Sequence, residues 1–165
     1  MKKAKFKENI KLLANKNIVY VDEVGFNEFY AREFAYSKIG TPVDGEISGR
    51  KFSRTNLVAG YHKNRLVGKM LYNENTTSAL FENWFKEILL PEIPRKSIIV
   101  LDNATFHNRN KLRKIALKKK CRAVFLPPYS PELNDIEQQW AIRKRKLKKN
   151  ASAHPTFFNA LLFNL

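Results

Sequence analysis

Short apolar runs separated by turn residues dominate the first part of the chain, and this pattern is typical of β-strands. A basic amphipathic helix is predicted first, at 3–15. The β-branched and aromatic run at 17–26 predicts a buried strand, and 33–43 predicts a second strand that ends in a Gly-Thr-Pro turn. Residues 55–72 divide at 62–64 into two shorter runs and therefore predict a hairpin.

Helical spacing appears in the second part of the chain. Residues 76–93 carry apolar side chains at intervals of three and four, which predicts a helix that Thr77 or Ser78 caps and that Pro91 ends. The elements predicted after it are a strand at 97–102, a basic helix at about 110–120, a strand at 122–127 and a helix at about 132–149.

The resulting order is three strands, helix, strand, helix, strand, helix. It predicts an α/β fold in which a three-strand antiparallel meander continues into β-α-β crossovers, giving a mixed sheet flanked by helices. We expect one domain at 17–150, preceded by a basic segment at 1–16 and followed by an apolar tail at 151–165.

The charge balance points to a polyanionic partner. The chain has 31 Lys and Arg against 15 Asp and Glu, a net charge of +16. That exceeds the magnitude of roughly 2–8 that suits the solubility of a small domain, so nucleic acid is the simplest partner. The basic stretches 109–122 and 143–149 are expected to bind phosphates without reading sequence; a solvated helix face is the alternative.

Cysteine and hydropathy exclude other classes of protein. The single Cys121 rules out a disulfide within the chain and a cysteine-based zinc cluster, and it fits a reducing cytosol. No run of about 18 apolar residues is present, so no membrane partner is expected.

Three carboxylates are candidates for a site. Asp102 ends the apolar run 98–101, where an unpaired buried charge would be costly, and strand ends of this kind gather ligands in α/β sheets. Asp22 lies in the first strand, with Glu23 on the opposite face, and Glu137 lies near the start of the last helix. Together these oxygens suit Mg²⁺ or Mn²⁺, and two such ions support phosphodiester chemistry.

Each carboxylate also has a local interpretation. Asp102 could accept backbone N–H groups of the segment that follows it. Glu137 could form a capping box with Asn134, and Asp135 and Glu132 could favour the helix N-terminus electrostatically. Spacing alone leaves both interpretations open.

Three motifs decide between them: VDEVGF, VLDNATFH and LPPYSPELNDIEQQW. They resemble the catalytic domain of DDE transposases of the mariner superfamily, most closely the bacterial insertion-sequence branch. That family has about 34 residues between its last two acidic residues, and here residues 103–136 separate Asp102 from Glu137. The resemblance extends over about 17–149 and implies a ribonuclease-H-like fold.

The resemblance implies a catalytic and metal-binding triad of Asp22, Asp102 and Glu137 with two Mg²⁺ or Mn²⁺ ions. Metal-activated water would cut the transposon end in double-stranded DNA, and the freed 3′ hydroxyl would attack target DNA at a TA step. The residues expected to support the site or contact DNA are Asn103, His107, Arg109, Arg143 and Lys144.

Two departures from the family pattern bear on this hypothesis. Asp135 replaces the usual proline. Relatives carry an N-terminal helix-turn-helix region, so 1–16 is expected to be a remnant of it or a linker, with that region encoded separately or lost.

The apolar tail is expected to pack on the domain, join a homodimer interface or be a truncation end. The alternatives are an inactive DNA-binding remnant and a nuclease acting on RNA–DNA hybrids. A bacterial, nucleoid-associated location in the cytoplasm is implied.

Overall fold

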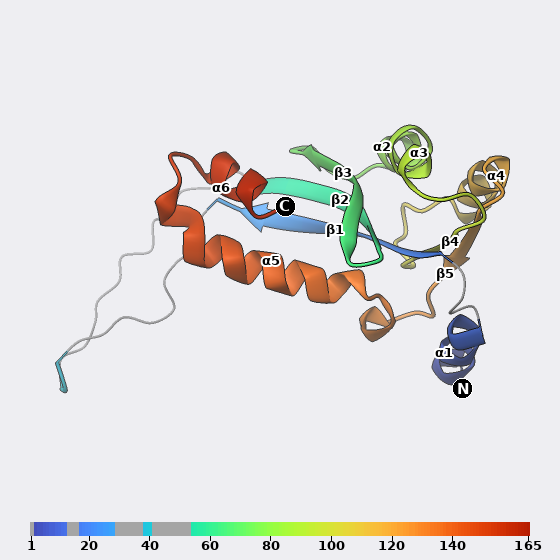
Figure 1. Ribbon diagram of the computed structural model, residues 1–165, viewed down its shortest axis with the longest axis horizontal. Helices are drawn as coiled ribbons and strands as arrows, with labels where there is room; N and C mark the ends of the chain where they lie inside the picture. The colour runs from blue at the N-terminus through green and yellow to red at the C-terminus, as the bar shows by residue number, and fades with distance from the viewer. Residues whose placement is uncertain (1, 13–16, 29–37, 41–53) are drawn as a thin grey trace.

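The residues that the structure describes form a five-stranded mixed sheet covered by helices on both faces (Figure 1). The computed structural model describes residues 2–12, 17–28, 38–40 and 54–165. The five strands are β1 (Ile18–Asn27), β2 (Arg54–His62), β3 (Arg65–Tyr72), β4 (Ile98–Leu101) and β5 (Arg122–Phe125). The predicted strand at 33–43 falls mostly outside the described residues, and 39–40 within it form a turn.

The strand order is β3-β2-β1-β4-β5, which confirms the predicted α/β class and mixed sheet. β1 pairs with β2, and β2 with β3, in antiparallel register, so the hairpin supplies two strands of the meander. β4 joins β1 in parallel through the pair Tyr20↔Val100, and β5 joins β4 in parallel. β1 therefore lies at the centre, where the antiparallel and parallel halves meet.

Helices form a layer on each side of the sheet (Figure 1). One layer holds α2 (Ser78–Trp84), a π-helical segment (Phe85–Leu89), α3 (Leu90–Glu92) and α4 (Arg109–Lys118). The other holds the long α5 (Ile136–Asn150), α6 (Phe157–Phe163) and α1 (Lys2–Leu12). Short 3₁₀ turns at Pro131–Leu133 and Ala151–Ala153 flank α5.

Strand alternation divides the core between the two faces. On β1, Val19 and Val21 pack with Phe81 and Trp84 of α2, whereas Val24 and Phe26 pack on the opposite face. Trp140, Ile136 and Leu147 of α5 join this second cluster and pack the last helix onto the sheet.

The helix predicted at 76–93 is correct in position but interrupted. Thr77 caps it as predicted, since its Oγ1 accepts a hydrogen bond from the Leu80 N–H at 3.2 Å. The prediction that Pro91 ends the helix is wrong by one residue, because helical structure continues to Glu92. Pro91 stands in the first turn of α3, where a missing backbone N–H is tolerated.

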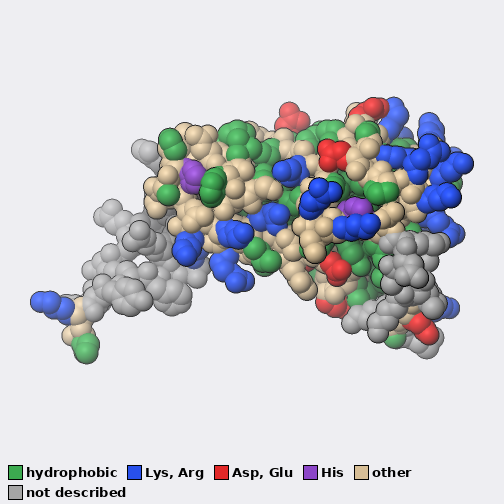
Figure 2. Space-filling view, viewed as in Figure 1, with side chains coloured by type: hydrophobic (Ala, Val, Ile, Leu, Met, Phe, Trp, Pro, Cys, Tyr) green, Lys and Arg blue, Asp and Glu red, His purple; other side chains and the backbone are tan. Residues whose placement is uncertain are grey.

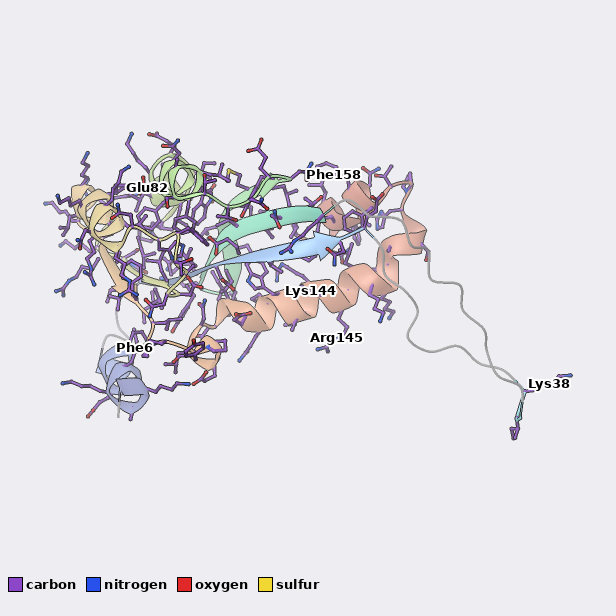
Figure 3. The ribbon with its side chains drawn as sticks, turned by 180° about the vertical axis from the view of Figure 1, so that it is seen from behind. Phe6, Lys38, Glu82, Lys144, Arg145 and Phe158 are labelled. Carbon is purple, nitrogen blue, oxygen red and sulfur yellow. The ribbon has the colours of Figure 1, made fainter. Side chains whose placement is uncertain are left out.

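The C-terminal segment folds back against the domain. Thr156 caps α6, and Ala160 and Leu161 are buried in the same cluster as Trp140. Phe158, labelled in Figure 3, and Phe163 remain exposed on the outer face of α6. No helix in the described ranges is long and apolar enough to cross a lipid bilayer.

Candidate active site

Asp22 and Asp102 are brought together by the parallel pairing of β1 with β4. The last pair in this register is Tyr20↔Val100, and each aspartate lies two residues beyond it on its own chain segment. The run Ile98–Leu101 is buried along its whole length, so Asp102 is the first side chain of this segment that is partly exposed. Asp22 thus lies within β1 and Asp102 directly follows β4, and these two strands are neighbours in the sheet.

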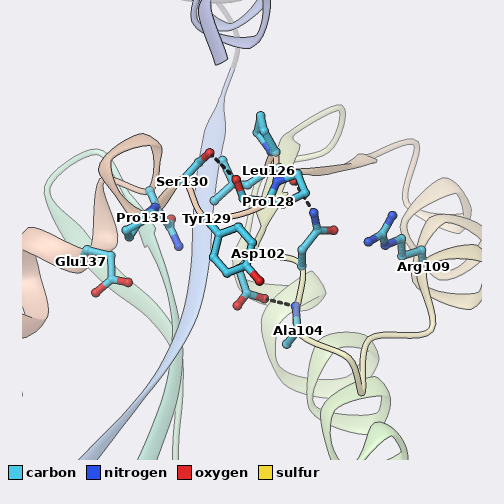
Figure 4. Close-up of a pocket in the computed structure, with 12 residues that line it drawn as sticks. Asp102, Ala104, Arg109, Leu126, Pro128, Tyr129, Ser130, Pro131 and Glu137 are labelled. Carbon is cyan, nitrogen blue, oxygen red and sulfur yellow. Dashed lines mark hydrogen bonds between the residues drawn. The ribbon is translucent and has the colours of Figure 1, made fainter. Parts of the chain in front are cut away.

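An open pocket of about 460 Å³ lies at this edge of the sheet (Figure 4). Asp102 and Glu137 both line it, together with the segment that connects β5 to α5. In Figure 4 the carboxylates of Asp102 and Glu137 lie on opposite sides of β1. The remaining lining residues are Asn103, Ala104, Arg109, Leu126, Pro127, Pro128, Tyr129, Ser130, Pro131 and Asn134.

Asp22 lies beside this pocket, on the α5 face of β1. Its Oδ2 accepts a hydrogen bond from the Trp140 indole N–H at 3.0 Å. Burial, followed by the negative charges of Glu137 and Glu23, raises the pKa of Asp22 from 3.8 to about 8. Asp22 therefore holds a proton at neutral pH when no cation is near, and Glu137 is close enough to contribute to that shift.

Glu137 does not form the capping box that was its local interpretation. The Asn134 backbone N–H donates to the Pro131 carbonyl at 2.9 Å, and the Asn134 side chain donates to the Val21 carbonyl at 3.3 Å. Asp135 holds the N-cap position without a side-chain cap bond. Within the described residues no hydrogen bond or ion pair engages the Glu137 carboxylate, so it is available to a ligand in the pocket.

Asp102 is fixed on its inner side. Its Oδ1 accepts the Ala104 N–H at 3.1 Å and lies 3.2 Å from Nδ1 of His107. Burial raises the pKa of Asp102, but His107 and the Ala104 N–H outweigh burial and hold that pKa below its ordinary value. Asp102 thus accepts a backbone N–H of the segment that follows it, as its local interpretation predicted. It also lines the pocket, so the two observations are compatible.

His107 and Glu23 form a second layer behind Asp102. Nε2 of His107 lies 3.7 Å from Oε1 of Glu23, on the face of β1 opposite Asp22. Burial lowers the pKa of His107, but the contacts with Asp102 and Glu23 outweigh it and raise that pKa to about 9. Glu23 was not among the residues predicted for the site, and no role was predicted for it. The signal that could have revealed one was strand alternation, which directs Glu23 to the face where His107 lies.

The other predicted residues occupy two different regions. Asn103 lines the pocket and donates to the Leu126 carbonyl at 2.8 Å, and Arg109 lines the pocket with its guanidinium 5.5 Å from the Phe125 ring centre. Arg143 instead donates to Oε1 of Gln139 at 2.8 Å, further along α5. Lys144 points outward from α5 (Figure 3). His107 is buried, so its position permits a supporting role and not contact with DNA.

The charged surface continues beyond the pocket. Figure 2 shows Lys and Arg side chains gathered over the end of the molecule that contains α4. Arg109 and Arg113 both lie over the Phe125 ring there, at 5.5 and 5.4 Å from its centre. This concentration of cations next to the pocket would attract a polyanion.

The acidic side chains fit a divalent cation by their chemistry. They offer only oxygen ligands, which Mg²⁺ and Mn²⁺ prefer, and Asp22 has a buried carboxylate that lacks a cationic partner in the described residues. In the conformation that the structure describes, no three His, Cys, Asp or Glu side chains of the described ranges are close enough together to hold a metal ion. Repulsion between ionised carboxylates keeps these side chains apart, and a bound cation would cancel that repulsion.

Comparison with known proteins identifies the family. Solved structures that share the fold include a Mos1 transposase paired-end complex with the left transposon end (18% identity, 88% of this chain, 47% of that chain, TM-score 0.69) and a Mos1 mariner paired-end complex with Mn (16%, 99%, 58%, TM-score 0.67). A simian T-cell lymphotropic virus intasome in complex with PP2A regulatory subunit B56 gamma is more distant (16%, 90%, 46%, TM-score 0.55).

The chain spans about half the length of the solved proteins that it matches. No curated protein sequence matches it. The sequence profile described as DDE superfamily endonuclease covers residues 17–156, which include β1, the pocket and all of α5. On this match, the chain belongs to the DDE superfamily of endonucleases.

Proposed function

We propose that this chain is the catalytic domain of a transposase, which cleaves DNA at a transposon end and joins the freed end to target DNA. Asp22, Asp102 and Glu137 would hold two divalent cations, Mg²⁺ or Mn²⁺. Bound there, the cations would activate the attacking oxygen and stabilise the leaving oxygen of a phosphodiester. The family is that of endonucleases, and two solved proteins of this fold are a Mos1 strand transfer complex and a Mos1 complex with Mg.

One observation carries the proposal. Asp102 and Glu137, far apart in sequence, line one pocket, and Glu137 lies close enough to Asp22 to help raise its pKa to about 8. Asp22 and Glu137 repel each other when both are ionised unless a cation lies between them, and Asp102 lines the same pocket as Glu137. The free carboxylate of Glu137 and the free Oδ2 of Asp102 support the same interpretation.

The residues around the triad would divide the remaining work. Trp140 orients Asp22 through its indole N–H, and Ala104 orients Asp102 through its backbone N–H. Arg109, at the pocket wall, would bind a phosphate of the DNA beside the scissile bond. Lys144 on the exposed side of α5 would bind a more distant phosphate, whereas the bond of Arg143 to Gln139 makes it less available.

A cleavage assay with the purified chain tests the proposal. The substrate is a labelled DNA duplex that carries the terminal repeats flanking the gene, incubated with Mg²⁺ or Mn²⁺ or with EDTA. We expect nicked or strand-joined products only with a divalent cation, and products that decrease as salt rises because the basic surface releases counterions on binding. An RNA–DNA hybrid of the same sequence serves as the control substrate.

Each outcome has a distinct meaning. Salt-sensitive DNA binding without cleavage, including after a separately encoded helix-turn-helix portion is added, would identify an inactive DNA-binding remnant. Preferential cleavage of the hybrid would identify a nuclease of the ribonuclease H type. Either result would overturn the transposase proposal.

A further inference from the structure

A buried imidazole lies between two carboxylates behind the pocket. Nδ1 of His107 is 3.2 Å from Oδ1 of Asp102, and Nε2 is 3.7 Å from Oε1 of Glu23. The His107 side chain is only 2% exposed and that of Glu23 is 16% exposed, against 41% for Asp102. In the described part of the chain neither ring nitrogen forms a hydrogen bond, so these two close approaches to carboxylate oxygens are the polar contacts of the imidazole. The three groups therefore form a line, Glu23–His107–Asp102, whose middle member is buried and whose last member lines the pocket.

Aromatic packing keeps the imidazole in this line. The Phe81 ring centre is 4.3 Å from that of His107, and the Phe106 ring centre is 4.5 Å away in an edge-on arrangement. Phe81 is itself anchored in the core of α2 against Trp84. The ring thus has little freedom to turn away from Asp102 and Glu23, and it cannot reach DNA.

The line acts on one oxygen of Asp102 only. Oδ1 accepts a hydrogen bond from the Ala104 N–H and lies 3.2 Å from Nδ1 of His107, whereas Oδ2 has no protein partner among the described residues. Two contacts on a single oxygen fix the plane of the carboxylate. Figure 4 shows the second oxygen of Asp102 on the side that faces β1 and Glu137.

We propose that Glu23 and His107 are positioning residues for the metal site: Glu23 orients His107, and His107 holds Oδ1 of Asp102 so that Oδ2 is presented to the divalent cation. This inference rests on the proposed function and assigns a part in it to Glu23, the acidic residue on the wrong face of β1 to bind the cation itself. Carboxylates that bind metals are commonly oriented in this way, and loss of the outer partner typically weakens metal affinity about 10–100-fold.

A purely structural role for the contacts among Glu23, His107 and Asp102 would give a different experimental result. If the line only stabilised the fold, its loss would lower the melting temperature and leave metal affinity unchanged once the variant had folded. If it positions Asp102, metal affinity falls even in a variant whose melting temperature in EDTA matches the parent. Metal affinity measured apart from activity separates the two roles.

The test is a Mn²⁺ titration of the full chain, followed by the electron paramagnetic resonance signal of free Mn²⁺. Glu23→Gln and His107→Gln should each weaken binding about 10–100-fold. His107→Asn should keep most of the affinity, because its side-chain amide can occupy the place of Nδ1 and donate to Asp102. Adding Glu23→Gln to His107→Asn should change nothing further, since Glu23 acts only through the imidazole.

Glu82→Gln is the matched control. Glu82 is also a buried carboxylate and also pairs with a cation, Lys111, but it has no contact with Asp102. Its substitution should leave Mn²⁺ affinity unchanged. Melting temperatures in EDTA establish that each variant is folded. If His107→Gln does not fold, the Mn²⁺ affinity of Glu23→Gln decides whether the positioning role holds.

Two failures can be told apart. If the parent chain binds no Mn²⁺, the proposed metal site fails and this inference fails with it. If the parent binds Mn²⁺ and both Glu23→Gln and His107→Gln bind it equally well, the metal site stands and the positioning role is overturned.

Discussion

Asp102→Asn should lower the rate of DNA cleavage by at least about a thousandfold, because metal-assisted stabilisation of a transition state is worth several kcal/mol. The substitution keeps the size of the side chain and an oxygen for the Ala104 N–H, which Oδ1 now accepts at 3.1 Å. It removes the negative charge that the cation requires. The rate of nicking in Mg²⁺, measured under single-turnover conditions, gives the result.

Asp135→Asn is the control for this experiment. Asp135 is an exposed carboxylate two residues before Glu137, at the N-cap position of α5, where asparagine serves as well as aspartate. Its substitution should leave the cleavage rate within a factor of about two. Normal cleavage by Asp102→Asn would contradict the assignment of the triad, and a loss in Asp135→Asn would add that residue to the site.

Trp140→Ala should lower the free energy of unfolding by about 3–5 kcal/mol. Trp140 is 3% exposed and packs in the cluster that joins α5 to β1 and β2. Its removal leaves a cavity and takes away the indole N–H that donates to Asp22. Because α5 carries Glu137, loosening this contact should also displace one carboxylate from the other two. Urea unfolding followed by circular dichroism measures the change.

Ile142→Ala on the same helix controls for effects on the helix itself. Ile142 is 39% exposed, so its truncation should change the free energy of unfolding by no more than about 0.5 kcal/mol. Trp140→Phe keeps most of the packing and removes only the donor to Asp22. Equal stability of Trp140→Ala and the parent would show that α5 is not held to the sheet by this residue.

Much of the fold is visible in the sequence because local signals agree with the tertiary structure. The hairpin was predicted from the break at 62–64, and Lys63 and Asn64 indeed adopt φ of 46° and 65°, the left-handed values that a two-residue hairpin turn requires. The strand predicted at 97–102 and the helix predicted at about 132–149 correspond to β4 (Ile98–Leu101) and α5 (Ile136–Asn150).

The interruption of the helix at 85–89 has no such local signal. Leu89 in this segment packs against the hairpin, where a Cβ added at Gly60 or Gly68 would come within 2.8 or 3.0 Å of its atoms. Gly68 also has φ of +60°, and β2 carries a register shift between Val58 and Gly60. The π-helical segment thus coincides with a close contact between distant elements, which helical periodicity cannot anticipate.

The sequence pattern proposes the acidic residues of the candidate site but not their surroundings. Alternation separated Asp22 from Glu23, and the motif spacing singled out Asp102 and Glu137. The sequence could not decide whether Glu137 caps its helix, because that depends on Asn134, which turns instead to the Val21 carbonyl. It could not pair Glu23 with His107 either, since that contact requires the tertiary packing of α2 and β1.

The position of bound Mn²⁺ is the most direct test of whether Asp22, Asp102 and Glu137 form one metal site. Crystals of the chain soaked in Mn²⁺ and measured at the manganese absorption edge would place the ion by its anomalous signal. If the three carboxylates form one metal site, the peak should lie in the pocket within coordination distance of carboxylate oxygens from Asp22, Asp102 and Glu137. A peak that one of the three carboxylates cannot reach, or no peak in the pocket at saturating Mn²⁺, would contradict it.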